Sequence, residues 1–150
     1  MEYGGPKFVL YDESGDRNDS TAAKIIARSA GDFSEATLLF ECCLSGDGRD
    51  EHLPHDARWR AYRQWRASHG ETGQLYNSPG HRFDAGEAER LSEVIAFTLT
   101  LGWDAIVAAK PGRQLLFLSH DDRLEIYRGF GGGALVRGLI ALGDCRRAGR

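Results

Sequence analysis

The sequence predicts a single α+β domain in which helices pack on one face of an antiparallel sheet, giving two layers. Three observations support this. Apolar runs of strand length recur along the chain, residues 104–120 form a hairpin rather than a strand–helix–strand unit, and residues 85–101 have a helical apolar stripe. The length of 150 residues agrees with one domain. The glycine-rich run at residues 129–133 separates residues 130–150 as a tail that we expect to be more loosely attached.

The first third of the chain contains two predicted strands. Residues 8–12, FVLYD, form a short apolar run, and the polar residues 13–20 that follow indicate a loop. The segment 22–30, AAKIIARSA, fits either a short helix or a strand. Residues 36–44, ATLLFECCL, predict a second strand, which ends at a turn-forming Ser-Gly-Asp-Gly sequence.

A helix is predicted over residues 55–69, with Pro54 near its start and Gly70 just beyond its end. Helical spacing places one set of side chains on one side, namely Trp59, Tyr62, Arg66 and His69, and another set on a second side, namely Arg58, Ala61 and Trp65. Residues 70–83 contain an Asn-Ser-Pro-Gly turn and are predicted to be a loop.

The helix over residues 85–101 is predicted from its termini as well as from its pattern. Asp84 fits the N-cap, Glu87 completes a capping-box pair, and Gly102 ends the helix. The predicted core-facing stripe consists of Ala88, Leu91, Val94, Ile95, Thr98 and Leu101.

Three further segments follow this helix. The runs 104–110 and 114–120 form the hairpin around a Pro-Gly-Arg turn. Residues 122–129 are a third strand or an extension of the second, and residues 134–142, ALVRGLIAL, predict a final short helix.

Composition excludes several function classes. The chain has 19 basic and 22 acidic residues and a net charge of −3, which argues against bulk attraction to nucleic acid or to an anionic membrane. The longest mostly apolar stretch, residues 94–101, is far shorter than the roughly 20 residues of a membrane span. With no apolar leader segment near the start, we expect a cytoplasmic protein.

The cysteines predict no special chemistry. An odd number, Cys42, Cys43 and Cys145, with two adjacent, suits reduced structural thiols better than a disulfide framework. No cysteine and histidine set has zinc-ligand spacing, so we expect neither a metal nor another cofactor.

The densest candidate site lies within the predicted helix 55–69. Residues 58–66 hold four arginines and three aromatic residues. Arginine and aromatic side chains are enriched at protein interfaces, and aromatic rings can also stack on bases. The candidate partner-binding residues are Arg58, Trp59, Arg60, Arg63, Trp65 and Arg66. A plain scaffold helix with a solvated arginine face, a protein-partner surface and a single-strand nucleic-acid surface all remain open.

A second candidate site is acidic. Asp12 and Glu13 lie at the end of one apolar strand, and His120 and Asp121 lie at the end of another, so carboxylates could hold a divalent metal. The tetrapeptide Asp-Glu-Ser-Gly at residues 12–15 resembles the N-terminal motif of a family of uncharacterised bacterial proteins with an RNase H-like nuclease fold. That resemblance implies a metal-dependent nuclease that would use Asp12 and Glu13. With His120 and Asp121 added from the end of a second strand as further alternative catalytic residues, the alternative function is a metal-dependent nuclease or phosphoesterase.

Residues 88–128 carry a different resemblance. An amphipathic helix ends in Gly-Trp-Asp, and a strand, a turn and a second strand ending in Ser-His-Asp follow it. This order is similar to the C-terminal part of small immunity-type proteins of bacterial polymorphic toxin systems. The resemblance implies a cytoplasmic protein that binds and inhibits a toxin or other effector and has no catalytic residues of its own. This is the function that we expect, and the sequence leaves the partner's identity and the oligomeric state open.

Overall fold

The computed structural model describes residues 7–10, 19–30, 32–42, 56–73, 75, 80–110, 114–120, 123–127 and 145–147. Its elements in chain order are β1 (Lys7–Leu10), α1 (Asp19–Ser29), β2 (Glu35–Cys42), α2 (Ala57–Ser68), β3 (Gly80–Asp84), α3 (Ala88–Leu101), β4 (Asp104–Lys110), β5 (Gln114–Ser119), β6 (Arg123–Tyr127) and β7 (Cys145–Arg147).

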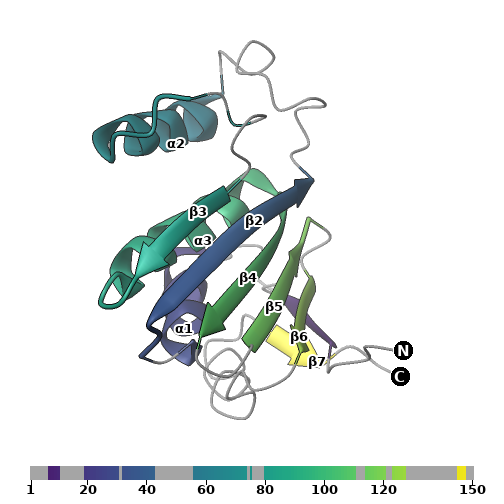
Figure 1. Ribbon diagram of the computed structural model, residues 1–150. Coiled ribbons are helices and arrows are strands. Elements are labelled where there is room, and N and C mark those ends of the chain that lie inside the picture. Colours follow the sequence, from purple (N-terminus) through teal and green to yellow (C-terminus); the bar gives the residue numbers. More distant parts are fainter. Residues whose placement is uncertain are drawn as a thin grey trace.

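The described strands form a seven-stranded sheet in the order β3-β2-β4-β5-β6-β1-β7, and every neighbouring pair is antiparallel. Helices α1 and α3 lie together behind this sheet, and α2 stands beyond its β3 edge (Figure 1). Tyr62 of α2 meets the inward ring of Phe40 on β2, with ring centroids 6.1 Å apart, so α2 packs on the same face as the other two helices. This confirms the predicted α+β fold with an antiparallel sheet.

The core lies between the sheet and these helices. Alternating strand residues face it, because successive side chains of a strand point to opposite faces. The sheet contributes Ala36, Leu38, Phe40, Phe83, Ala105, Val107, Ala109, Leu116 and Leu118, all of them buried. Helix α3 contributes Leu91, Val94, Ile95 and Thr98, which is the stripe that its periodicity predicts.

The structure decides one segment that the sequence left open and corrects another. Residues 22–29, open between helix and strand, belong to helix α1, and Ala30 is a turn residue after it. The prediction of a loop over residues 70–83 is wrong at its end, because β3 begins at Gly80 and pairs with β2. The strand alternates, with His81 and Phe83 buried and the residues beside them not, but a polar histidine in an inward position hid this pattern.

The start of α3 also differs. Asp84 does not cap it, because Asp84 is the last residue of β3 and Glu87 takes the N-cap position. The Glu87 carboxylate accepts a hydrogen bond of 2.7 Å from the Asp84 backbone N–H, which is the reverse half of a capping box. Gly102 ends the helix as predicted, with φ 66° in the left-handed region that favours glycine.

The C-terminal prediction is tested only in part. Cys145–Arg147 form β7, which pairs with β1 at the edge of the sheet, so this part of the tail joins the sheet. The predicted helix over residues 134–142, and the end of the first predicted strand at residues 11–12, lie outside the described residues.

Candidate functional site

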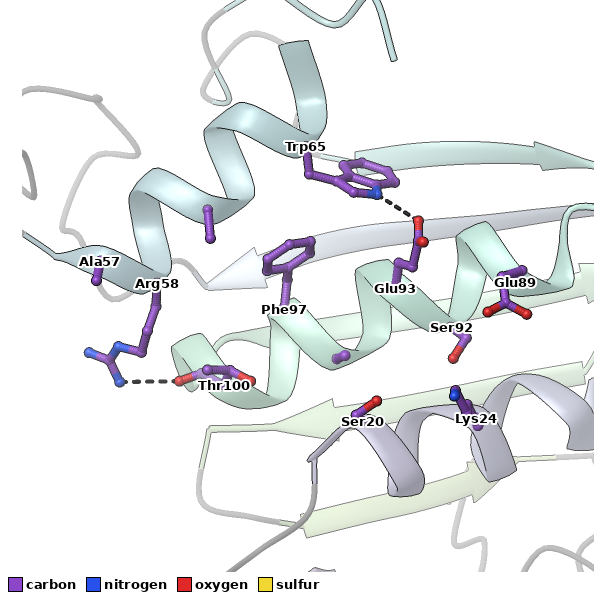
Figure 2. A pocket seen from close by; sticks show the side chains of 12 residues that line it. Ser20, Lys24, Ala57, Arg58, Trp65, Glu89, Ser92, Glu93, Phe97 and Thr100 are labelled. Atoms are coloured by element: carbon purple, nitrogen blue, oxygen red, sulfur yellow. Dashed lines mark hydrogen bonds between the residues drawn. The ribbon is translucent and has the colours of Figure 1, made fainter. Parts of the chain in front are cut away.

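A groove of about 660 Å³ lies between the three helices (Figure 2). Its walls and floor are formed by Ser20 and Lys24 of α1, by Ala57, Arg58, Ala61 and Trp65 of α2, and by Glu89, Ser92, Glu93, Ala96, Phe97 and Thr100 of α3. A groove of this volume is in the range of ligand-binding sites.

Helical periodicity explains why α3 can form the floor. Its six lining residues, Glu89 to Thr100, recur at steps of three or four and therefore share one stripe along the helix. The stripe on the opposite side is buried against the sheet. The same rule applies to α2, where Ala57, Ala61 and Trp65 stand four residues apart on one side. Each helix thus has one face for the core and another for the groove.

The middle of the groove is apolar. Ala61, Trp65, Ala96 and Phe97 meet there, and the rings of Trp65 and Phe97 lie 6.1 Å apart. The Trp65 Nε1–H donates a hydrogen bond of 2.7 Å to a Glu93 carboxylate oxygen, which ties α2 to α3 across the groove (Figure 2). Because this bond satisfies the indole N–H, the ring can stay half-buried and present its apolar surface to the groove.

One end of the groove is held by Arg58. Its guanidinium donates to the Thr100 carbonyl oxygen at 3.2 Å and to both carboxylate oxygens of Asp56, at 3.1 and 2.7 Å. Asp56 is the N-cap of α2 and also accepts from the backbone N–H groups of Arg58 and Trp59. These hydrogen bonds lower the pKa of Asp56 to about 2, and the bond from the Arg58 side chain has the largest effect. The carboxylate thus stays ionised and fixes the start of α2.

Behind Trp65 lies a buried polar network. The Tyr62 hydroxyl and the Nε2 of His81 are 2.7 Å apart, and the Nδ1 of His81 is 2.8 Å from a Glu71 carboxylate oxygen. Burial lowers the pKa of His81 below its ordinary value, against the carboxylate of Glu71, which raises it. The imidazole is therefore neutral at physiological pH, and its two nitrogens join α2, β3 and the segment after α2.

Two arginine side chains also lie beside the Glu71 carboxylate. Arg90 of α3 donates to it at 2.9 Å, and the Nε of Arg66 lies 3.6 Å from its other oxygen. Arg66 is only 4% exposed, so its charge needs this carboxylate nearby. The network neutralises a buried cation and belongs to the scaffold, since the side chain of His81 has no exposed surface.

The structure divides the six predicted partner-binding residues of α2 into three pairs. Trp59 and Arg66 are buried, so they support the core and cannot form part of an accessible surface. The reason is that their side of α2 faces the sheet. Arg58 and Trp65 line the groove, whereas Arg60 and Arg63 are exposed outside it. His69, which helical spacing places on the same side as Trp59 and Arg66, is not buried with them and is the exposed C-cap residue of α2.

The acidic candidate site is only partly described. Asp12, Glu13 and Asp121 lie outside the described residues. His120 follows β5 and is exposed, and its backbone N–H and Nδ1 lie 2.6 and 2.8 Å from one carboxylate oxygen of Asp104. Within the described ranges, no three histidine, cysteine or acidic side chains gather as metal ligands would. The nuclease interpretation remains a prediction.

Sequence reasoning missed most of the groove. It placed Arg58, Ala61 and Trp65 together on one side of α2, which is the groove side. It did not single out Lys24, Glu93, Ala96 or Phe97. The sequence did contain a signal for them. Beside its core stripe, α3 has a second stripe that runs from acidic residues through Ala96 and Phe97 to Thr100.

None of the described helices is long and apolar enough to cross a membrane. In comparisons with known proteins, no family model, no curated protein and no solved structure matches the chain.

Proposed function

We propose that the protein acts in the cytoplasm as a non-enzymatic binding protein, and that the groove between α1, α2 and α3 is its contact site for a protein partner. One observation carries the proposal: the apolar middle of the groove, Ala61, Trp65, Ala96 and Phe97, is open and is bordered by charged residues of both signs. An apolar centre with aromatic anchors and a polar rim is the usual composition of a protein interface.

The position of the titratable groups supports binding over chemistry at this site. The most elaborate polar network, Tyr62–His81–Glu71, lies behind Trp65, and Tyr62 is fully buried. A general acid or base must come within hydrogen-bond reach of its substrate. In the groove itself, Arg58 and Glu93 already hold the helices together through Thr100 and Trp65.

The most specific form of the proposal is an immunity protein or inhibitor that occludes a bacterial toxin or another effector. Its support is the resemblance of residues 88–128 to immunity-type proteins, because α3, which forms the groove floor, is the first element of that segment. Such a protein acts by steric occlusion, and the exposed arginines of α2 outside the groove, Arg60 and Arg63, would affect the rate of encounter with a partner that carries an acidic surface beside the contact.

Site-specific photocrosslinking tests this proposal. A benzophenone amino acid replaces Ala61, which lines the groove, or Ala67, which is exposed on the same helix outside it. In cells of the source organism, we expect the Ala61 position to form an adduct with one predominant protein and the Ala67 position to form little or none. Equal adducts from both positions, or no intermolecular adduct at Ala61, would contradict the proposal.

A further inference from the structure

We infer, on the basis of the proposed function, that the partner inserts one amphipathic α-helix into the groove. Its apolar stripe lies on Ala61, Ala96 and Phe97, and a lysine or arginine of that helix lies beside Glu89 and Glu93. The inference rests on the shape of the groove, on the backbone chemistry of its walls and on the charges at one of its ends.

The dimensions of the groove suit a helix. Its floor runs along α3 from Glu89 to Thr100, which at 1.5 Å per residue is about 17 Å, or three helical turns. Helices pack at axial distances of about 8–10 Å, and close approach requires small side chains at the contact. Alanines supply these on two of the elements, Ala57 and Ala61 on α2 and Ala96 on α3.

The walls also favour a helix over an extended segment. The groove is formed by helices, whose backbone N–H and C=O groups are bonded within each helix. An extended peptide would bury backbone groups that find no partner there, at a cost comparable to lost hydrogen bonds. A helix satisfies its own backbone and presents only side chains, which the apolar middle with Trp65 and Phe97 can accommodate.

The charges at one end of the groove favour a basic residue on the inserted helix. Glu89 and Glu93 are exposed and stand four residues apart on α3, a spacing at which like charges destabilise a helix. The Trp65 indole fixes one Glu93 oxygen, and Glu89 has no ion-pair partner within the described part of the chain. A cation placed between the two carboxylates would relieve this repulsion. Lys24 of α1 also lines the groove and would repel a basic residue that points toward α1, so the basic side chain of the inserted helix faces the carboxylates of α3.

A set of three synthetic peptides tests this inference on the full chain. Each has about 16 residues and a leucine stripe at helical spacing. One carries lysines beside the stripe, the second carries glutamates at those positions, and the third is the lysine peptide with two central prolines that prevent a helix. Isothermal titration calorimetry measures affinity. A change in tryptophan fluorescence that is lost in Trp65→Phe reports contact with Trp65, because Trp59 and Trp103 are buried away from the groove.

We expect the lysine peptide to bind about tenfold tighter than the glutamate peptide, a modest electrostatic preference, and the proline peptide not to bind. Ala61→Glu should abolish binding, whereas Ala67→Glu, at an exposed position of the same helix outside the groove, should leave it unchanged. Glu89→Lys should remove most of the preference between the lysine and glutamate peptides, because the new lysine offsets the charge of the remaining Glu93. Because both glutamate-introducing variants change exposed alanines, circular dichroism should show the same fold for each.

Three outcomes would overturn the inference: no peptide binds, the proline peptide binds as well as the lysine peptide, or Ala61→Glu has no effect. None of these affects the photocrosslinking test, in which a partner could still be captured through another kind of segment. An adduct that joins the Ala61 position to another part of the same chain would overturn both the inference and the proposed function.

Discussion

His81 is the residue on which the polar network of this fold depends. It lies on β3, is 3% exposed, and has a hydrogen-bond partner at each ring nitrogen, Tyr62 on one side and Glu71 on the other. Neutral imidazole has one donor and one acceptor nitrogen, so it can satisfy both partners without a buried charge. Protonation would place a cation close to Arg66 and Arg90, both of which lower the pKa of His81.

This arrangement makes stability depend on pH in a defined direction. Because burial lowers the pKa of His81 in the folded protein, the unfolded chain binds more protons once the pH falls through about 6.5. The contribution of His81 to the free energy of unfolding should therefore be constant above about pH 6.5. It should decrease as the pH falls below that value, and it should become constant again below the pKa of His81 in the folded protein. Urea denaturation at a series of pH values from about 8 to about 5 measures this dependence of the free energy of unfolding on pH. A His81→Gln variant should lose this slope, and equal slopes in both proteins would contradict the prediction.

The Tyr62 hydroxyl gives a second test at this scale. Tyr62→Phe keeps the ring contacts with Phe40 and Trp103 but leaves the Nε2 of His81 buried without its partner. We expect a loss of about 1–3 kcal/mol in the free energy of unfolding. In a His81→Phe background, the same change should cost much less, since the unsatisfied group is then absent. Equal losses in the two backgrounds would show that the hydrogen bond is not what matters.

At the scale of elements, helix α3 packs against the sheet with one side and lines the groove with another. Leu91, Val94 and Ile95 face the sheet, while Glu93, Ala96 and Phe97 face the groove. The stability of the fold and the properties of the groove therefore depend on different stripes of one helix.

Two substitutions on α3 separate these roles. Leu91→Ala should lower the free energy of unfolding by about 2–5 kcal/mol, because Leu91 is fully buried and the change leaves a cavity. Glu89→Ala, at an exposed position two residues earlier, should change it by less than about 0.5 kcal/mol. Chemical denaturation monitored by circular dichroism measures both. A small loss for Leu91→Ala would mean that α3 contributes little to the core.

The elements differ in how far the sequence predicts them. Strands β2, β4 and β5 are apolar runs, so local pattern suffices for them. Strand β3 is short, and its inward His81 is acceptable only because Tyr62 and Glu71, from elsewhere in the chain, bond to it. Arg66 likewise faces inward because Glu71 lies near it. The groove depends on where α1 and α2 pack against α3, which no local pattern specifies.

At the scale of the whole molecule, the described helices cover one face of the sheet and leave side chains exposed on the other. Leu39 on β2 is 48% exposed and Leu115 on β5 is 40% exposed. Ile106, which pairs with Leu39, and Phe117, which pairs with Ile106, are only partly buried between them. Alternation along each strand thus divides one apolar sheet into a packed face and an outer face.

Neighbouring residues of β2 test this division. Leu39→Thr keeps a residue that suits a strand, and it should change the free energy of unfolding by less than about 0.5 kcal/mol. Leu38→Thr, one position earlier and fully buried, should lower that free energy by about 2–5 kcal/mol, because it removes core packing and buries a hydroxyl. Thermal and urea denaturation compare the two variants. A comparable loss from both would mean that the outer face is covered.

The place of β1 in the sheet has a consequence for how the molecule is made. Strand β1 lies between β6 and β7, and both of these partners come from the last fifth of the 150-residue sequence. During synthesis, β1 leaves the ribosome long before either partner exists. The helices and strands β2 to β5 can assemble from contacts closer in the chain, whereas β1 must close the longest loops of the fold, which slows folding. Its backbone groups meanwhile remain unpaired, so the nascent chain passes through a stage in which an unpaired strand is open to chaperones or to other nascent chains.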